Sequence, residues 1–146
     1  MQLGGSLPEF TLPDQDWNDF HSKNLLGKKS VIFFYPKDES VGCTKEACSF
    51  RDRFEDFKEL NAEVIGISGD TPDDHREFKE KHNLPFTLLC DRKSEVRKMF
   101  HVSSSVFGLI PGRVTFIFDE NGTLIKKYDS QVSFEKHVTK ALDALD

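Results

Sequence analysis

The sequence predicts an α/β fold in which helices flank a central mixed β-sheet, within a single domain over residues 1–146. Two observations lead to this fold class. Short apolar runs rich in β-branched and aromatic residues alternate with amphipathic stretches, as in parallel strands joined by right-handed helical crossovers. No repeat, low-complexity tract or Gly/Ser linker divides the chain, and 146 residues is the size of one ordinary domain.

The first predicted strand is a continuous apolar run at residues 31–35, which Pro36 ends. Such a run is typical of a strand buried on both faces, so we expect it at the centre of the sheet. After a loop at residues 36–42, apolar side chains recur every three or four positions through residues 47–60. This spacing predicts one amphipathic helix.

A second buried strand is predicted at residues 62–68. Thr71 and Pro72 follow it, with two acidic residues directly behind them. An N-cap residue, a first-turn proline and first-turn acids together predict a helix start, and this helix should run to about His82.

The second half of the chain completes the sheet. It contains a short predicted strand at residues 86–89, a short helix at 94–100, a hairpin pairing 114–118 with 123–128, and a final helix at 133–145. Because hairpin strands run antiparallel, the sheet should be mostly parallel with antiparallel strands added last.

Composition excludes several classes of partner and location. The formal net charge is −5, from 20 basic and 25 acidic residues, which disfavours nucleic acid because such binding needs clustered cations. The apolar runs are far shorter than the roughly 20 residues that span a bilayer, so no membrane span is expected. Three cysteines do not form a fully paired disulfide framework, which favours a reducing intracellular compartment.

Cys43 is the first candidate for chemistry. It stands where the loop at 36–42 meets the predicted helix, and unpaired N–H groups and the helix dipole favour an anion there. The position therefore favours a reactive thiolate. The alternative is an inert buried cysteine, although a Gly-Cys-Thr turn is poorly placed to fill a core.

Cys48 lies five positions further along the same predicted helix. Helical geometry would hold the two Cα atoms roughly 8 to 9 Å apart. A disulfide needs Cα atoms within about 7 Å, so the first helical turns must unwind if the two cysteines pair. From spacing alone, Cys48 fits a small core residue beside Ala47 and Phe50 equally well.

Residues 34–48 read FYPKDESVGCTKEAC, and this segment resembles the active-site segment of a known enzyme family. The segments at 66–70, 84–89, 96–98 and 108–113, together with Gln131 and residues 135–137, extend the likeness over nearly the whole chain. This pattern resembles peroxiredoxins of the bacterioferritin-comigratory or peroxiredoxin Q subfamily, and the plant and algal members most of all.

The resemblance implies a thioredoxin-like fold and a hydroperoxide-reducing enzyme without a metal or organic cofactor. It implies that Cys43 attacks the terminal peroxide oxygen and becomes a sulfenic acid, which Cys48 resolves as an intramolecular disulfide. Pro36 would shield the thiolate and narrow the pocket. Ser40 would hydrogen-bond the peroxide and the thiolate, and Arg113 would stabilise negative charge on the sulfur and the departing oxygen.

The resemblance also implies partners and surroundings. Thioredoxin or a related dithiol protein would restore the thiols, and the chain would act as a monomer. The compartment would be a plastid if the source is a plant or alga whose transit segment is removed, and the cytoplasm if the source is bacterial. The walls of the peroxide pocket would include Phe107 and Leu109.

Two positions depart from the commonest family pattern, which has threonine at Ser40 and often proline at Val41. Serine keeps the hydroxyl but has a looser side-chain rotamer than β-branched threonine. We therefore expect activity to persist with somewhat poorer positioning of the hydroxyl.

Other residues and other functions fit the sequence less well. Glu46 is interpreted as a first-turn acid, Cys90 as a small residue at a strand end or else a redox-sensitive thiol. The chain lacks the Cys-x-x-Cys motif that thiol–disulfide oxidoreductases use. A Cys-His hydrolase would need a histidine base, and nothing in the sequence identifies which histidine that would be. A zinc module would draw on the two helix cysteines and five histidines, which are too scattered in sequence for a structural site and are interpreted as surface or loop residues: His21, His75, His82, His101 and His137.

Overall fold

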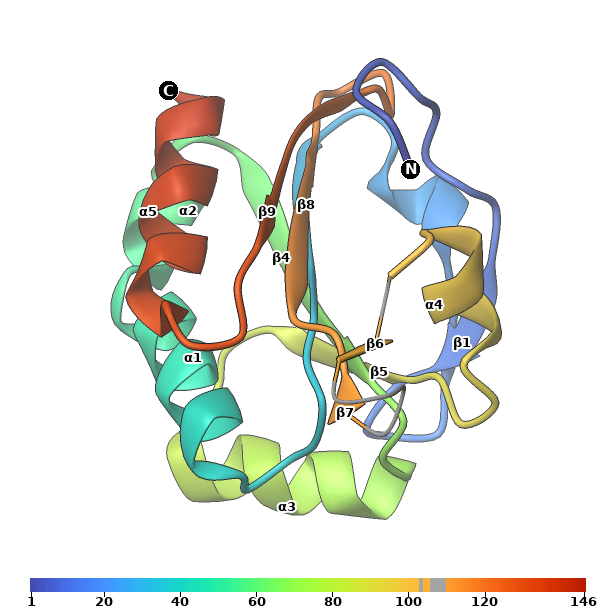
Figure 1. The fold of residues 1–146 in the computed structure, drawn as a ribbon, viewed down its shortest axis with the longest axis vertical. Coiled ribbons are helices and arrows are strands. Elements are labelled where there is room, and N and C mark those ends of the chain that lie inside the picture. The colour runs from blue at the N-terminus through green and yellow to red at the C-terminus, as the bar shows by residue number, and fades with distance from the viewer. Residues whose placement is uncertain (103, 106–109) are drawn as a thin grey trace.

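A five-stranded mixed sheet with helices on both faces forms the centre of the computed structural model, which describes residues 1–102, 104–105 and 110–146 (Figure 1). The strand order is β5-β4-β3-β8-β9, with bounds Thr87–Cys90, Ala62–Ser68, Lys29–Phe34, Val114–Phe118 and Leu124–Asp129. β3, β4 and β5 are mutually parallel, whereas β8 and β9 are antiparallel additions. The predicted fold class and strand arrangement are confirmed.

β3 is the central strand, as predicted from its continuous apolar run. Val31 pairs with Val64 of β4 on one side and with Ile117 of β8 on the other. Successive side chains point to opposite faces of the sheet, so Val31 and Phe33 enter one core while Ile32 and Phe34 enter the other. From Ser30 to Phe34 the strand is buried on both faces.

Five helices cover the two faces: α1 (Val41–Asp52), α2 (Phe54–Glu59), α3 (Pro72–His82), α4 (Glu95–Met99) and α5 (Phe134–Leu145). Figure 1 shows α1, α2 and α5 on one side of the sheet and α4 on the other. Phe50, Phe57 and Val138 join the first core, and Phe100, after α4, joins the second. The first core also receives Cys43 and Ala47 from α1.

The helix predicted through residues 47–60 is two helices. Arg53 has φ −107° and ψ 13°, outside the helical region, so it ends α1 and begins α2. The apolar spacing continues across this break because Phe50 and Phe57 both enter the same core. Periodicity alone therefore conceals the interruption.

The start of α3 matches the prediction closely. The Thr71 side chain accepts a hydrogen bond from the Asp74 backbone N–H at 3.1 Å, and Pro72 occupies the first helical turn. The helix ends at His82, where Asn83 adopts a left-handed conformation. Further elements were not anticipated from the sequence: β1 (Thr11–Pro13), β2 (Asp19–His21), η1 (Ser22–Leu25), β6 (Ser104–Ser105) and β7 (Ile110–Pro111).

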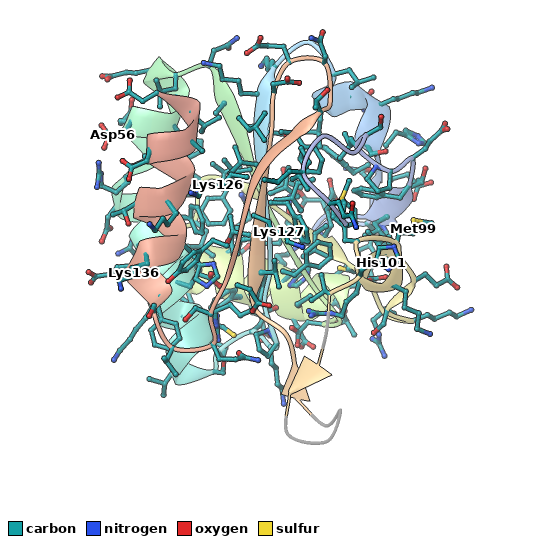
Figure 2. The ribbon with its side chains drawn as sticks, turned by 45° about the horizontal axis from the view of Figure 1, so that its top comes forward. Asp56, Met99, His101, Lys126, Lys127 and Lys136 are labelled. Carbon is teal, nitrogen blue, oxygen red and sulfur yellow. The ribbon has the colours of Figure 1, made fainter. Side chains whose placement is uncertain are left out.

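β9 forms one edge of the central sheet and carries Lys126 and Lys127, with Lys136 on nearby α5 (Figure 2). Charged side chains on an edge strand discourage pairing with a foreign strand. Across the part of the chain that the structure describes, no helix has the length and apolar character needed to cross a bilayer.

Candidate active site

Cys43 lies in the first turn of α1 and is 1% exposed. Ser40 is the N-cap, and its Oγ accepts a hydrogen bond from the Cys43 backbone N–H at 3.4 Å. The sulfur therefore stands at the positive end of the helix dipole, as the sequence predicted.

Arg113 immediately precedes β8 and is buried, with its donors directed at three groups. Nη2 donates to Cys43 Sγ at 3.3 Å, Nη1 donates to Glu46 Oε1 at 2.8 Å, and Nε donates to the Gln131 carbonyl at 3.2 Å. Arg113 is only 4% exposed, so it is a buried cation and not a surface one. A charged donor is therefore fixed against the sulfur, where it can stabilise negative charge that develops during a reaction.

Gly42 allows an aromatic ring to cover this pair. A Cβ atom at Gly42 would lie 2.6 Å from the Phe134 ring, which is closer than real contacts permit. The same ring lies 4.9 Å from the Arg113 guanidinium, within the range of a cation–π contact. The N-terminus of α5 thus packs over the start of α1 and confines Arg113.

Glu46 is a site residue that the sequence interpretation missed. It is fully buried and forms an ion pair with Arg113, so it is not simply a first-turn acid at the surface. Burial raises the pKa of Glu46 to about 7 even though the Arg113 charge and hydrogen bond lower it. The signal available in the sequence was its place three residues after Cys43, on the same helix face.

Two of the five histidines are core residues, which corrects the surface interpretation. His75 and His137 are both 0% exposed, and each imidazole has polar neighbours at both ring nitrogens. Each occupies the apolar face of its helix, His75 three residues before Phe78 and His137 four before Ala141. That spacing was the available signal.

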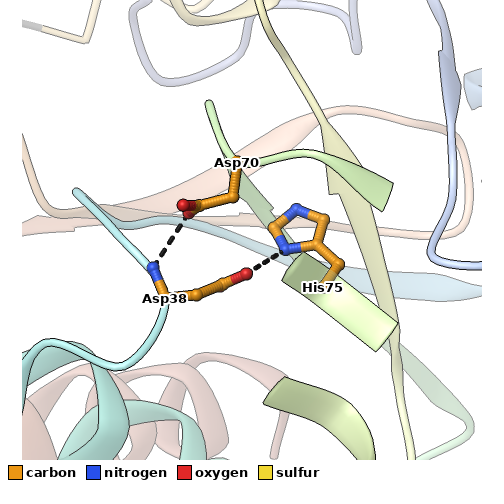
Figure 3. A group of neighbouring side chains, drawn as sticks. All are labelled: Asp38, Asp70 and His75. Atoms are coloured by element: carbon orange, nitrogen blue, oxygen red, sulfur yellow. Dashed lines mark hydrogen bonds and ion pairs between the residues drawn. The ribbon is translucent and has the colours of Figure 1, made fainter. Parts of the chain in front are cut away.

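His75 anchors the loop before α1 through Asp38, as Figure 3 shows. Its Nδ1 lies 2.6 Å from Asp38 Oδ2, and the Asp38 backbone N–H donates to Asp70 at 2.9 Å. Tyr35 Oη donates to the other Asp38 oxygen. This loop carries Pro36 and Ser40, so the network holds both next to the helix start.

Both nitrogens of His75 act as donors. Nδ1 faces the Asp38 carboxylate and Nε2 lies 2.9 Å from the Leu89 carbonyl, which only accepts. Burial alone would lower the pKa of His75, but the Asp38 bond and charge, with Cys90 nearby, raise it to about 10. His75 is therefore an imidazolium ion-paired with Asp38.

Asp38, Asp70 and His75 also form the one group of potential metal ligands found in the described part of the chain. In this arrangement the His75 nitrogens both carry hydrogen, so neither offers a lone pair to a metal. The cluster fits a loop anchor better than a metal site.

The remaining predicted site residues are placed as follows. Cys48 is half-buried on α1 and lines a surface groove of about 640 Å³ together with Val132 and Lys136. Burial raises the pKa of the Cys48 thiol. Pro36 is half-buried directly after Tyr35, and Phe107 and Leu109 lie outside the described residues.

Cys43, Cys48 and Cys90 are all free thiols. Cys90 is the last residue of β5 and is 1% exposed, which matches the interpretation as a small strand-end residue. It lies beside His75.

Replacing Ser40 with threonine tests how tightly the hydroxyl is held. Ser40 Oγ donates to the Lys37 carbonyl at 2.9 Å, and a β-branched side chain would restrict it further. We expect Ser40→Thr to react about two- to fivefold faster with hydrogen peroxide, from roughly 0.5–1 kcal/mol of saved rotamer entropy. Stopped-flow rate constants measure this, and unchanged kinetics would contradict it. The control, Ser40→Ala, should cost about 1 kcal/mol of stability through loss of the cap.

The sequence and fold of the chain are similar to those of known proteins. Residues 3–127 match the model of the AhpC/TSA family. The chain belongs to the AhpC/TSA family. Within that family its relatives are peroxiredoxins of the Q type, which confirms the resemblance found in the sequence.

Two of these relatives come from plants. The chain is 48% identical over 142 residues to the chloroplastic peroxiredoxin Q of Oryza sativa subsp. japonica, covering 97% of this chain and 65% of that protein. It is 46% identical over 142 residues to chloroplastic peroxiredoxin Q of Sedum lineare, covering 97% of this chain and 76% of the relative. The AhpC/TSA chain thus spans less than two thirds of the length of the rice protein.

Solved structures share the fold. Peroxidoxin BcpB from Mycobacterium tuberculosis is 34% identical with a TM-score of 0.91, covering 99% of this chain and 96% of that one. A bacterioferritin comigratory protein from Xanthomonas campestris is 26% identical with a TM-score of 0.85, covering 93% and 89%. The thioredoxin-like fold expected of this AhpC/TSA chain is therefore confirmed.

Proposed function

We propose that this chain is a thiol-dependent peroxidase that reduces hydrogen peroxide and organic hydroperoxides. The observation that carries the proposal is the Arg113 guanidinium donating to Cys43 Sγ, 3.3 Å away, at the N-terminus of α1. A buried thiolate held by a fixed cation is a prepared nucleophile, and the same cation can stabilise the oxygen that leaves. The names of the relatives support the same reaction class.

The reaction begins with attack of the Cys43 thiolate on the terminal peroxide oxygen. An S–O bond forms, the O–O bond breaks, and the sulfur is oxidised by two electrons to a sulfenic acid. The departing RO⁻ or HO⁻ takes up one proton and leaves as an alcohol or water. Ser40 at the helix cap and Pro36 in the anchored loop are the groups that we assign to positioning the peroxide and shielding the sulfur. Attack by the Cys48 thiol on the sulfenic sulfur then releases water and forms the disulfide.

That disulfide requires α1 to unwind. Both cysteines belong to the continuous helix α1, which keeps their Cα atoms roughly 8 to 9 Å apart. Since a disulfide tolerates about 7 Å at most, the turn between Cys43 and Cys48 must open. α1 ends at Asp52, so only about two and a half turns separate Cys43 from the last residue of the helix.

A dithiol protein such as thioredoxin is the proposed reductant. Cys48 lines an open groove, whereas Cys43 is almost fully buried, so Cys48 Sγ is the sulfur that a partner thiolate can approach. The AhpC/TSA chain would act as a monomer in a reducing compartment. The chloroplastic names of the relatives support a plastid if the source is a plant or alga, with the cytoplasm as the bacterial counterpart.

The test is stopped-flow reaction of the reduced protein with one equivalent of hydrogen peroxide, followed by mass spectrometry. We expect the wild type to lose two hydrogens rapidly and to contain a Cys43–Cys48 link. The Cys48→Ser variant should react equally fast and stop at a Cys43 sulfenic acid, which a dimedone adduct identifies. If Cys43 shows no fast reaction, the peroxidase proposal is wrong.

A further inference from the structure

One carboxylate oxygen of Glu46, next to Arg113, is buried without a hydrogen-bond partner among the described residues. Glu46 Oε1 accepts from Arg113, but among the described residues Oε2 has no hydrogen-bond partner, although the carboxyl group is 0% exposed. A buried polar atom left without a partner costs about 1–3 kcal/mol, so such an atom calls for an explanation. The neighbouring nitrogen is His137 Nδ1, 3.4 Å away.

The hydrogen bonds of His137 determine where its own proton lies. Nε2 is 2.8 Å from the Ser130 carbonyl, which only accepts, so Nε2 carries the hydrogen of the neutral ring. Nδ1 is then an acceptor with one lone pair, which the Thr115 hydroxyl, 2.8 Å away, and a protonated Glu46 Oε2, 3.4 Å away, can each use. Two acceptors, Glu46 Oε2 and His137 Nδ1, therefore face each other with no hydrogen between them.

One added proton would give Glu46 Oε2 a partner, because a protonated carboxyl can donate to His137 Nδ1 in place of the Thr115 hydroxyl. Burial raises the pKa of Glu46 to about 7, and burial together with the Arg113 charge lowers the pKa of His137 to about 4 despite the opposing Ser130 carbonyl bond. Such a proton therefore resides on Glu46 Oε2, from which it can donate to His137 Nδ1.

The charged and titratable groups at the Glu46–His137 pair, including the pair itself, come from α1, α5, β9 and the residue before β8. They are Cys43 and Glu46 of α1, Arg113 before β8, His137 of α5, and the Tyr128 ring of β9, which packs edge-on against His137. Arg113 is the one cation in direct contact with both Glu46 and Cys43 among the described residues. The charge on the sulfur and the charge on Glu46 therefore depend on each other.

We propose that Glu46, supported by His137, is the proton donor that balances oxidation of Cys43: it holds a proton while Cys43 is a thiolate and releases it when the sulfur becomes neutral. This inference rests on the proposed peroxidase function. With a thiolate present, Arg113 already has a counter-ion, and a second buried anion beside it is unfavourable. Once the sulfur is neutral, Arg113 needs the Glu46 carboxylate.

The complete step balances within the site. Cys43–S⁻, Cys48–SH, ROOH and Glu46–COOH give the Cys43–Cys48 disulfide, ROH, H₂O and Glu46–COO⁻. The net charge of the reacting groups is unchanged, and no proton is taken from solvent. Because Glu46 lies between the two cysteines on α1, the unwinding that forms the disulfide also exposes the carboxyl group and favours its ionised form.

The test counts protons. The reduced wild-type protein is mixed with one equivalent of hydrogen peroxide in weak buffer with a pH-indicator dye, and proton uptake per disulfide is measured. We expect near-zero uptake at about pH 6 and one proton per disulfide at about pH 8.5, where Glu46 is ionised beforehand. Glu46→Gln copies the protonated acid, since its amide can donate to His137 and accept from Arg113, but it has no proton to release. It should take up one proton at both pH values.

Two histidine variants complete the design. His137→Gln removes the ring acceptor and places an amide donor in reach of Oε2, so the pH of half-maximal uptake should fall by about one unit, the equivalent of one neutral hydrogen bond. His101→Gln, at an exposed position, is the control and should behave as wild type.

Each outcome decides the matter. Equal uptake by wild type and Glu46→Gln at about pH 6, or an unshifted midpoint in His137→Gln, would overturn the proton-donor role. Absence of any fast reaction with peroxide in the wild type would instead overturn the peroxidase proposal on which it rests. A disulfide formed with one proton taken up at both pH values by wild type leaves the peroxidase standing and removes this inference alone.

Discussion

Replacing Arg113 with glutamine is expected to slow the reaction with hydrogen peroxide by about 100- to 1,000-fold, the usual cost of losing one charge-stabilising donor at a reaction centre. Arg113 is the donor to Cys43 Sγ and the counter-ion of buried Glu46, and its guanidinium is held under the Phe134 ring. Glutamine has neither the charge nor the fork of donors that reaches both groups. The second-order rate constant from stopped flow measures the loss.

Matched variants separate chemistry from folding. Arg113→Gln also removes the donor to the buried Glu46 Oε1, which should lower the free energy of unfolding by about 1–3 kcal/mol. The double variant with Glu46→Gln should regain much of that stability while the rate stays low. If the double variant also regained the rate, Arg113 would act on folding alone. Arg113→Lys, which keeps the charge without the fork, should fall between wild type and Arg113→Gln.

Replacing His75 with glutamine is expected to lower the free energy of unfolding by about 3–5 kcal/mol, the cost of leaving one partner of a buried ion pair behind. Asp38 and His75 are both almost fully buried, and their nearest atoms are 2.6 Å apart. Urea unfolding at neutral pH measures the change. The control is His101→Asn, an exposed substitution at a left-handed position that asparagine tolerates, which should cost less than about 0.5 kcal/mol.

A double-mutant cycle tests whether this loss of unfolding free energy comes from the Asp38–His75 ion pair. Asp38→Asn combined with His75→Gln should destabilise the protein by clearly less than the sum of the two single variants, because the second substitution removes a charge that the first has already stranded. Additive losses would show that the two side chains act independently.

The same ion pair predicts a direction for the pH dependence of stability. The pKa of His75 is raised to about 10 in the folded chain, against about 6.5 in an unfolded one. Between these values the folded state binds more protons than the unfolded state, so stability falls as pH rises. The stability gap between wild type and His75→Gln should be full below about pH 6.5 and should shrink as pH rises through about 10. A gap that is constant with pH would contradict the assignment.

Local chemistry was enough to predict most elements. The strand at β3 follows from an uninterrupted apolar run, and α3 from Thr71, Pro72 and its first-turn acids, because such signals act between residues a few positions apart. The break at Arg53 escaped prediction because Phe50 and Phe57 keep the apolar spacing on both sides of it. The N-terminal hairpin of β1 and β2 escaped because each strand has only three residues.

By itself, the sequence determined the fold class, the family and the position of Cys43 at a helix start, since each depends on residues near one another in the chain or on a pattern that spans it. Only the tertiary structure decided which charged groups are buried. Glu46 and Arg113 are 67 positions apart, and Asp38 and His75 are 37 apart, so no local spacing connects them. Ion pairs of this kind form because packing of the helices on the sheet removes both partners from water together, and that desolvation is a property of the assembled fold.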